Sequence, residues 1–228
     1  MDITKEKILC SATQLFFRIG IKSITMDDVA RDLGISKKTL YIYVNNKKDL
    51  LHQVIELQIE KEVEAAKLIH QKSGNAIDEV MGFATYSVEM LKQFSPTVLY
   101  DLQKFYPDLW SLVDQLQNKH HYIAHKMNIE RGIREGLYRN DIHPEVIAKL
   151  FVSKSLCIVD EHIFPSKSFS NVSLLREHVM YHLRGICTPK GIEVFQNYVN
   201  TLEDWSDASH ITQAWLNLMP DQKFVKQN

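Results

Sequence analysis

The chain contains few residues that interrupt helices, since its 228 residues include only eight glycines and six prolines. Alternating apolar and polar runs, which are typical of strands, are also rare. Apolar residues make up 45% of the composition, enough for a hydrophobic core, and this excludes a globally disordered chain. We therefore predict an all-α protein with short connections between its helices.

Cysteine is scarce too, and Cys10, Cys157 and Cys187 lie far apart without a C-x-x-C spacing. This pattern does not fit a disulfide framework or a zinc knuckle, and it fits a reducing cytoplasm. No apolar run approaches the length of a membrane span, and the opening MDITKEKIL does not have the continuous apolar core of a secretory signal. We expect a cytoplasmic location and no membrane partner.

The motifs of common catalytic and cofactor sites are missing, because the sequence contains no G-x-G-x-x-G, G-x-x-x-x-G-K or G-x-S-x-G. Two histidine pairs, His121 with His125 and His178 with His182, have the i, i+4 spacing of metal ligands, but neither has a cysteine or the glutamate of H-E-x-x-H. We predict no catalytic residue, no metal and no cofactor. An α-helical enzyme with an incidental basic segment is an alternative that no set of nucleophile, base and orienting residue supports.

Charge is unevenly distributed although the net charge is only -1. Residues 1–51 hold nine Lys/Arg and six Asp/Glu, a net of +3, and the rest of the chain holds eighteen and twenty-two, a net of -4. A basic first segment on an acidic remainder suggests that the first segment meets an anionic partner.

Helical periodicity predicts two helices at the start of the chain. Apolar residues recur at spacings of three and four between Lys5 and Ile19, and the helix that they form ends at Gly20. Thr25 and Asp28 have the spacing of a capping box at the start of a short second helix, which ends at Gly34.

Two more helices are predicted directly after this point. Ser36 can cap a third helix in which Leu40 and Val44 point inward, and a fourth helix begins near Asn46 and runs to about His70. Only the turn around Gly34 separates the second helix from the third, and glycine permits the left-handed backbone that such a turn needs. Short helices joined this tightly and supported by a first helix have the helix-turn-helix layout.

Residues 8–51, ILCSATQLFFRIGIKSITMDDVARDLGISKKTLYIYVNNKKDLL, resemble the DNA-binding domain of the TetR family of bacterial transcriptional regulators. The shared features are the Phe16-Phe17 pair, Gly20, Thr25, the V-A-x-x-L-G-I-S run through Gly34 and Ser36, T-L-Y at Thr39 to Tyr41, and Lys47. The resemblance implies a DNA-binding domain over residues 1–47 and a helical ligand-binding and dimerisation domain over residues 48–228.

The resemblance also implies roles for single residues. Phosphate contacts are expected from Thr25, Tyr41, Tyr43 and Lys47, and base contacts from Lys37, Lys38, Thr39 and Ile42. Two departures from the family pattern, Tyr43 where histidine is common and Val44 where phenylalanine is common, leave the sequence preference open. A packing module with merely solvated lysines is the alternative interpretation, and the agreement of caps, turn glycine, core spacing and cations weighs against it.

The remaining chain also has helical patterns, over roughly residues 77–93, 95–106, 110–136, 144–164, 172–186 and 190–202. Aromatic and methionine side chains are concentrated in its first half and are candidates for lining a small-molecule site. These candidates are Phe83, Tyr86, Met90, Phe94, Tyr100, Phe105, Tyr106, Trp110 and Tyr122. Packing in the core explains most of the same residues, and the aromatic richness favours an apolar or aromatic ligand.

Residues 131–151 resemble the family's junction before the first dimerisation helix, and Pro144 marks the restart of a helix. The resemblance implies a homodimer through helices near 144–164 and 172–186. The candidates for the dimer seam, the surface where the two copies meet, are Leu150, Phe151, Leu156, Ile158 and Val159. Packing in an intramolecular core explains the same residues. A dimer also suits DNA, since two recognition helices must reach major-groove faces about 34 Å apart.

The sequence therefore predicts a ligand-responsive transcriptional regulator. We expect a repressor that a small molecule releases from a palindromic double-stranded operator, with the long fourth helix transmitting the change. The alternative is a helix-turn-helix protein whose larger part is a protein-interaction module without a small-molecule site.

Overall fold

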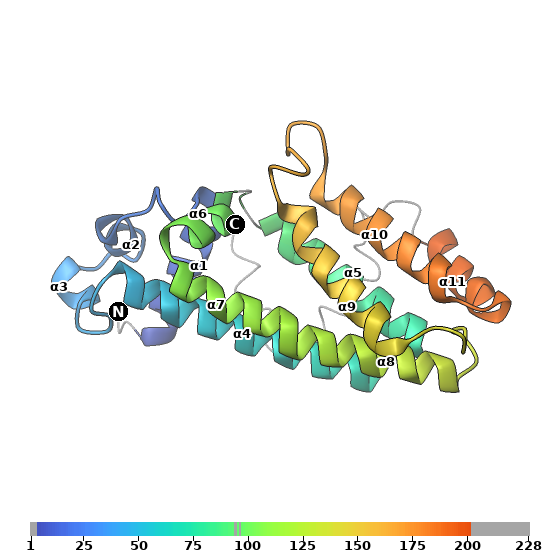
Figure 1. Ribbon diagram of the computed structural model, residues 1–228. Helices are drawn as coiled ribbons and strands as arrows, with labels where there is room; N and C mark the ends of the chain where they lie inside the picture. Colours follow the sequence, from blue (N-terminus) through green and yellow to red (C-terminus); the bar gives the residue numbers. More distant parts are fainter. Residues whose placement is uncertain (1–3, 94, 96, 202–228) are drawn as a thin grey trace. The chain divides into compact units, whose positions relative to one another are not determined.

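The computed structural model describes residues 4–93, 95 and 97–201 (Figure 1). Within these residues every regular element is a helix, apart from an isolated bridge between Tyr138 and Cys187. The helices are α1 (Lys5–Ile19), α2 (Met26–Asp32), α3 (Lys37–Leu40), α4 (Lys47–Lys72), α5 (Ala76–Gln93), α6 (Thr97–Phe105), α7 (Pro107–Gln115), the π-helical η1 (Leu116–His121), α8 (Tyr122–Arg134), α9 (Pro144–Ser155), the 3-10 segment η2 (Leu156–Val159), α10 (Asn171–Ile186) and α11 (Pro189–Thr201). The predicted all-α class is confirmed. No helix in this described part has the length and apolar character that crossing a membrane requires.

Contacts divide the chain into two compact units. The first unit comprises Met1–Glu62 and Gln93–Leu116, and the second comprises Val63–Lys92 and Gln117–Asn228. The helix α4 is continuous, with its first part in the first unit and its last turns in the second. The functional division predicted after residue 47 stays a prediction.

The first unit contains the predicted helix-turn-helix. Side chains of Thr25 and Ser36 cap α2 and α3 as predicted, and the side chain of Thr4 caps α1. The predicted inward positions Leu40 and Val44 are buried, and so the third helix presents its other side chains outward. The helix is short, however, because α3 ends at Leu40 and a turn carries the chain to Val44.

The helices α6 and α7 complete the core of the first unit. Val98 and Leu102 of α6 and Leu109 of α7 are buried in the same apolar cluster as Phe16 of α1 and Leu50 of α4. Burying a side chain of this size contributes about 1.5–3 kcal/mol. The helix-turn-helix therefore shares one core with a segment that lies far along the chain.

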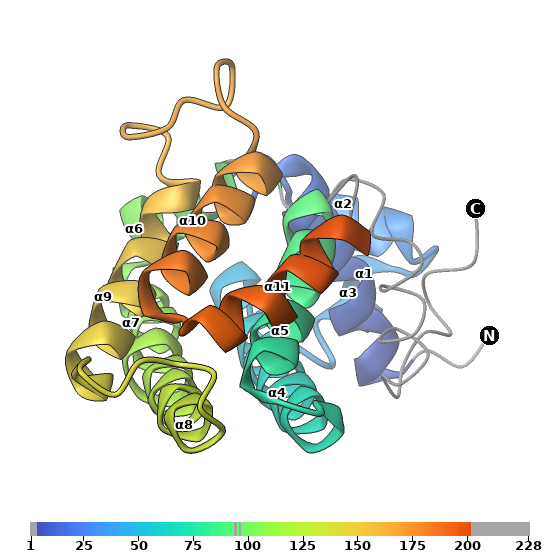
Figure 2. The same cartoon turned by 90° about the vertical axis from the view of Figure 1, so that its right-hand side faces the viewer.

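The second unit contains α5 and α8 to α11, and Figure 2 shows α10 and α11 running past α5 on one side of it. Its core includes Ile77 of α5, Leu183 of α10 and Phe195 of α11, all almost completely buried. Tyr138, between α8 and α9, is buried as well and donates its hydroxyl hydrogen to Asn128 Oδ1 at 3.2 Å. The predicted start of a helix at Pro144 is confirmed.

Two long helices were predicted in one piece and are interrupted. The range 110–136 contains the end of α7, the π-helical η1 and then α8, and it reaches only Arg134. The helix predicted over 144–164 ends at Ser155 and continues as a 3-10 segment to Val159. Asp160 then accepts a hydrogen bond from the His162 N–H at 2.8 Å, and this local turn replaces the helical bond.

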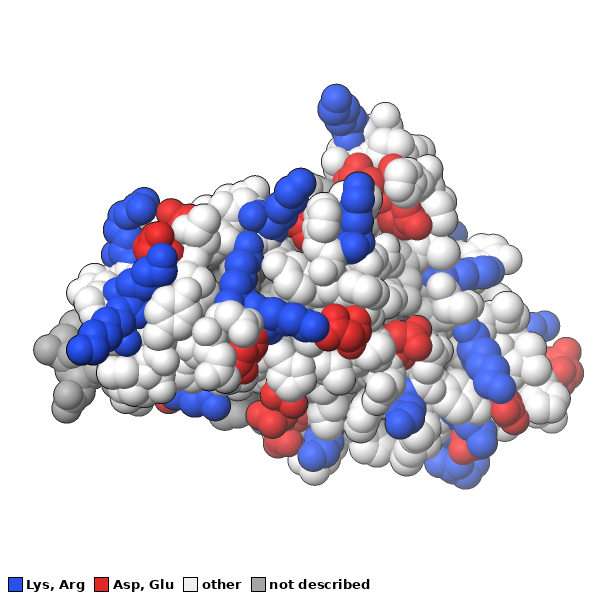
Figure 3. All heavy atoms as spheres, turned by 60° about the vertical axis from the view of Figure 1, so that its left-hand side comes forward, with Lys and Arg blue, Asp and Glu red and all other residues white. Residues whose placement is uncertain are grey.

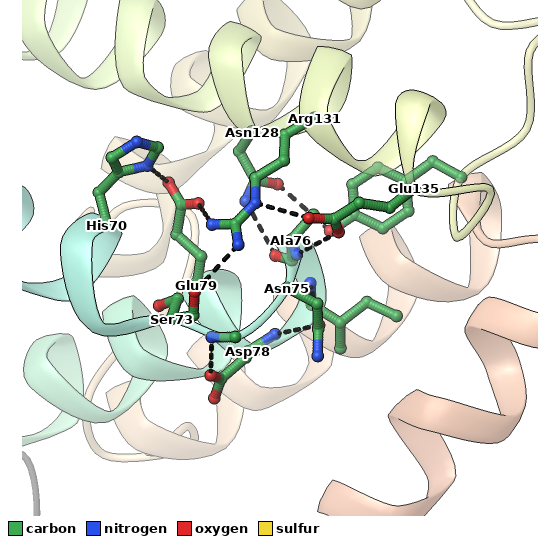
Figure 4. Close-up of polar contacts among 12 residues, drawn as sticks. His70, Ser73, Asn75, Ala76, Asp78, Glu79, Asn128, Arg131 and Glu135 are labelled. Carbon is green, nitrogen blue, oxygen red and sulfur yellow. Dashed lines mark hydrogen bonds and ion pairs between the residues drawn. The ribbon is translucent and has the colours of Figure 1, made fainter.

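A polar network joins the end of α4, the start of α5 and the end of α8 within the second unit (Figure 4). Arg131 donates through Nη1 to Glu79 Oε2 at 3.0 Å, through Nε to Glu135 Oε1 at 2.7 Å, and through Nη2 to the Ser73 carbonyl oxygen at 2.9 Å. The Glu79 side chain is only 4% exposed, and His70 Nδ1 lies 3.0 Å from its Oε1. The buried carboxylate of Glu79 is therefore paired with the guanidinium group of Arg131.

Candidate nucleic-acid interface and ligand-binding residues

Two glycines shape the turns that connect the first three helices. Gly20 and Gly34 have φ values of 102° and 64°, in the region where other residues are strained. A Cβ at Gly20 would also lie 2.6 Å from Thr97 Oγ1, so the turn after α1 closely approaches α6. The predicted need for glycine at position 34 is confirmed by its backbone.

Thr25 forms the predicted capping box with Asp28. Its Oγ1 accepts from the Asp28 N–H at 3.2 Å, and its own N–H and hydroxyl donate to Asp28 Oδ2 at 2.9 and 2.6 Å. These hydrogen bonds lower the pKa of Asp28. The Thr25 hydroxyl hydrogen is thus committed to the cap, and a phosphate would have to compete for it.

Lys37 is paired within the protein, at 2.9 Å from Asp27 Oδ1, and this carboxylate raises its pKa. Both partners are exposed, so the pair adds little stability and an anionic ligand can replace Asp27. Lys38 is exposed, and Thr39 lies at the helix start with its Oγ1 2.8 Å from Ser36 Oγ.

The turn after the third helix carries exposed apolar surface. Ile42 is 73% exposed and Tyr41 is 43% exposed, whereas Tyr43 packs partly against the core of the first unit. The exposed Ile42 side chain is available to a partner, and a thymine methyl group is a suitable apolar contact. Figure 3 brings the α2 and α3 side of Figure 1 forward and shows many Lys and Arg side chains on this face, with acidic groups between some of them.

Lys47 begins α4 and lies beside the turn between α1 and α2. Its Nζ donates to the Lys22 carbonyl oxygen at 3.4 Å, and partial burial lowers its pKa. The charges of Asp101 and Asp28 act in the opposite direction. The ammonium group is therefore held in place at the start of α4.

Sequence reasoning missed the carboxylates that α6 and α7 bring to this region. Asp101 is buried, and its Oδ2 accepts from the Lys22 N–H at 2.8 Å. Asp108 Oδ2 lies 2.6 Å from Lys48 Nζ. A signal for Asp101 was available, because it occupies an inward position of the apolar stripe formed by Val98 and Leu102.

The nine predicted ligand-binding residues are divided between the two units. Tyr100, Phe105, Tyr106 and Trp110 belong to the first unit, Phe83, Tyr86, Met90 and Tyr122 belong to the second, and Phe94 lies outside the described residues. Tyr106 and Trp110 pack partly against the core around the helix-turn-helix, while Tyr100 and Phe105 are exposed. The structure thus gives the first-unit aromatics contacts of their own, and the ligand roles stay predictions.

In the second unit, Phe83, Tyr86 and Met90 share one half-buried face of α5. Tyr122 begins α8, with Lys149 Nζ 5.6 Å from the centre of its ring. These four residues are the part of the predicted ligand set that lies within the second unit.

The histidines pair across helices rather than along them. His125 Nε2 lies 3.0 Å from His182 Nε2, and the Phe151 ring stacks on both His125 and His178, with centroids 4.0 and 4.3 Å away. Burial lowers the pKa of His178 to about 4 and that of His182 to about 3. Across the residues that the structure describes, no group of three or more His, Cys, Asp or Glu is arranged to hold a metal ion.

Comparison with known proteins agrees with this geometry. Residues 8–54 match the model of bacterial regulatory proteins of the tetR family. The chain is 24% identical over 182 residues to the HTH-type transcriptional regulator YvaF of Bacillus subtilis, covering 79% of this chain and 94% of that protein. It is 28% identical over 102 residues to IcaR of Staphylococcus aureus, the negative transcriptional regulator of the biofilm operon icaADBC, covering 45% of this chain and 49% of that one.

A solved structure has the same fold: the transcriptional regulator FadR of Bacillus subtilis, in complex with stearoyl-CoA, superimposes with a TM-score of 0.62. The identity is 14%, and the match covers 80% of this chain and 100% of that one. The capped helices, the turn glycines and these similarities lead to one conclusion: the chain belongs to the TetR family of helix-turn-helix, DNA-binding transcriptional regulators.

Proposed function

We propose that this regulator is a homodimeric repressor that leaves a palindromic operator when a small apolar or aromatic molecule binds. Members of the family bind operator DNA and small-molecule effectors. The observations that carry the proposal are the outward surface of α3 and the following turn, with the exposed Lys38 and the 73% exposed Ile42, and the ordered cation of Lys47 at the start of α4. A negative regulator among the relatives, IcaR, favours repression over activation.

The residue roles follow from exposure and chemistry. In this proposal Lys37, Lys38, Thr39 and Ile42 contact base edges, and Thr25, Tyr41, Tyr43 and Lys47 contact phosphates. Lys38 and Ile42 are supported most directly, because both are exposed. Lys37 joins them when it exchanges Asp27 for a base or phosphate acceptor.

Selection from random duplexes at two salt concentrations tests the DNA part. Wild-type protein should enrich a palindrome, and Lys47→Gln should reduce the salt slope of the binding constant by about one without changing the enriched sequence. Ile42→Ala should instead relax the preference at one position in each half-site. Lys67→Gln, which replaces an exposed lysine of α4 in the second unit, is the matched control. Equal effects of Lys47→Gln and Lys67→Gln would contradict the assignment of Lys47.

The helices α9 and α10 support the proposed dimer. Val146 and Leu150 on α9 are each 49% exposed, and Tyr181 on α10 is 74% exposed. Exposed apolar side chains on neighbouring helices are what a second copy would cover. Of the five seam candidates, Leu150 is exposed, whereas Ile158 belongs to the core of the second unit.

Sedimentation measures this association directly. Tyr181→Glu places a charge in the proposed seam and should shift the protein from dimer to monomer, with weaker operator binding as a consequence. Arg176→Gln, an exposed change on another face of the same helix, is the control. A Tyr181→Glu protein that stays dimeric would place the seam elsewhere.

The ligand class rests on the α5 face formed by Phe83, Tyr86 and Met90 and on the similarity to FadR, whose structure contains a long acyl chain. A ligand that prefers the conformation with poor operator affinity weakens DNA binding by the same factor by which DNA weakens ligand binding. We assign the transmission to α4, because this single helix is part of both units.

A thermal-shift screen with acyl and aromatic compounds, followed by operator titration, tests the coupling. A compound that raises the melting temperature should also lower operator affinity, and Tyr86→Ala should weaken both effects together. If compounds bind and operator affinity never changes, the release mechanism is wrong. If no compound of either class binds, the alternative of a protein-interaction module is favoured.

A further inference from the structure

A cluster of two lysines and two aromatic rings lies at the edge of the first unit, and we call it the α6 cluster. It consists of Lys22, Tyr100, Lys104 and Phe105. Both ammonium groups lie over Phe105, with Lys22 Nζ 4.9 Å and Lys104 Nζ 5.6 Å from the ring centre. Lys104 Nζ is also 5.0 Å from the Tyr100 ring centre and donates to the Tyr100 hydroxyl oxygen at 2.6 Å.

The aromatic rings position these two cations without neutralising them. In the part of the chain that the structure describes, no carboxylate forms an ion pair with Lys22 or Lys104, in contrast to the pair between Lys48 and Asp108. The nearby Asp101 is buried and accepts from the Lys22 backbone N–H. A cation held over a ring keeps its charge, so the exposed surface of the cluster attracts anions.

The α6 cluster is continuous with the proposed phosphate contacts. Lys47 Nζ donates to the Lys22 carbonyl oxygen at 3.4 Å, and its charge also acts on Asp28, which closes the capping box with Thr25. Lys22 precedes Thr25 by three residues in the same turn. The turn before α2, the start of α4 and the end of α6 therefore carry neighbouring cations.

We propose that Lys22 and Lys104 bind phosphate groups of the operator, so that the DNA interface extends from the helix-turn-helix onto α6. The inference rests on the proposed function, because it adds contacts to the same DNA-binding surface. These contacts supply affinity without sequence preference, since phosphates are the same at every position. The aromatic rings reduce the entropy lost on binding, because they hold both ammonium groups before DNA arrives.

Salt titration of binding to the selected operator and to a random duplex tests this extension. Lys22→Gln and Lys104→Gln should each reduce the salt slope by about one, so a fourfold rise in salt costs each variant about fourfold less affinity than it costs wild type. Affinity for operator and random duplex should fall by the same factor. Lys67→Gln is again the control, and Phe105→Leu, which retains an apolar side chain without a ring, should weaken binding in the same direction.

Phosphate ethylation locates the contacts. Wild-type protein should show interference at phosphates where Lys104→Gln shows none, while the base-contacted positions stay the same. If Lys47→Gln changes the salt slope and Lys22→Gln and Lys104→Gln do not, the extension onto α6 is wrong and the proposed function stands. If wild-type protein binds no duplex at low salt, both are overturned.

Discussion

Removing Arg131 from the network of Figure 4 should destabilise the second unit strongly, because it leaves a buried negative charge behind. The Glu79 side chain is 4% exposed and receives Arg131 Nη1 at 3.0 Å, and the guanidinium also binds Glu135 and the Ser73 carbonyl oxygen. In Arg131→Met, His70 Nδ1, at 3.0 Å, is the remaining polar neighbour of the Glu79 carboxylate among the residues that the structure describes.

The structure indicates the size of the effect. Breaking a buried ion pair by removing one partner costs about 3–5 kcal/mol, whereas replacing both partners with uncharged groups of similar volume costs far less. We therefore expect Arg131→Met to lower the free energy of unfolding by about 3–5 kcal/mol. The double variant Arg131→Met with Glu79→Gln should recover about half of this loss.

Urea unfolding at pH 7 and one fixed protein concentration measures both values, since dimerisation makes stability depend on concentration. Arg139→Met is the matched control, because Arg139 pairs with Asp141 at 3.8 Å and both side chains are exposed. Its cost should stay below about 1 kcal/mol. An Arg131→Met protein as stable as the Arg139→Met protein, or a double variant no more stable than the single one, would refute the buried-charge argument.

Four further changes test the capping and packing of the helices and the protonation of a buried histidine. Thr25→Ala removes the capping box of α2 and should lower the free energy of unfolding by about 1 kcal/mol in urea. Gly132→Ala adds a methyl group that overlaps the Tyr138 ring and should lower the free energy of unfolding by about 1–3 kcal/mol. Gly185→Ala, with open space around it, should stabilise the protein by up to about 1 kcal/mol. A stabilising Gly132→Ala would contradict this packing. Burial lowers the pKa of His182 from 6.5 to about 3, so between these two pH values the unfolded state binds more protons than the folded state. The stability that neutral His182 contributes is therefore complete above about pH 6.5 and falls by about 1.4 kcal/mol per pH unit below it. Urea titrations from pH 7 to pH 5 should show that the free energy of unfolding changes less steeply with pH in His182→Asn than in wild type. An unchanged pH dependence would contradict the assignment.

The helix-turn-helix was predictable because its signals are local. The caps Thr25 and Ser36, the glycine at position 34 and the inward Leu40 act over three or four residues and have the predicted places in the structure. Val44 is buried as predicted, although it lies beyond the end of α3. Side-chain hydrogen bonds to nearby backbone groups and left-handed glycines operate in the same way in any chain that forms these helices. The roles of the outward residues remain predictions that DNA binding must test.

The interruptions of the longer helices were not predictable to the same degree. Periodicity over 110–136 and 144–164 continues through η1 and η2, since a π-helical or 3-10 segment changes the hydrogen bonds without removing the apolar residues. The competing turn at Asp160 depends on one side-chain acceptor. Apolar spacing alone cannot distinguish it from a helical position.

The sequence by itself determined the all-α class and the capped second and third helices, because these follow from composition and from contacts between near neighbours, and its resemblance over residues 8–51 indicated the family. Only the tertiary structure decided that α6 and α7 share the core of the helix-turn-helix, that Asp101 receives the Lys22 N–H, and that His125 meets His182. These partners are 79 and 57 residues apart, and their meeting depends on how whole helices pack. No short stretch of sequence carries that information, because the apolar faces of all the helices must pack against one another in a single arrangement.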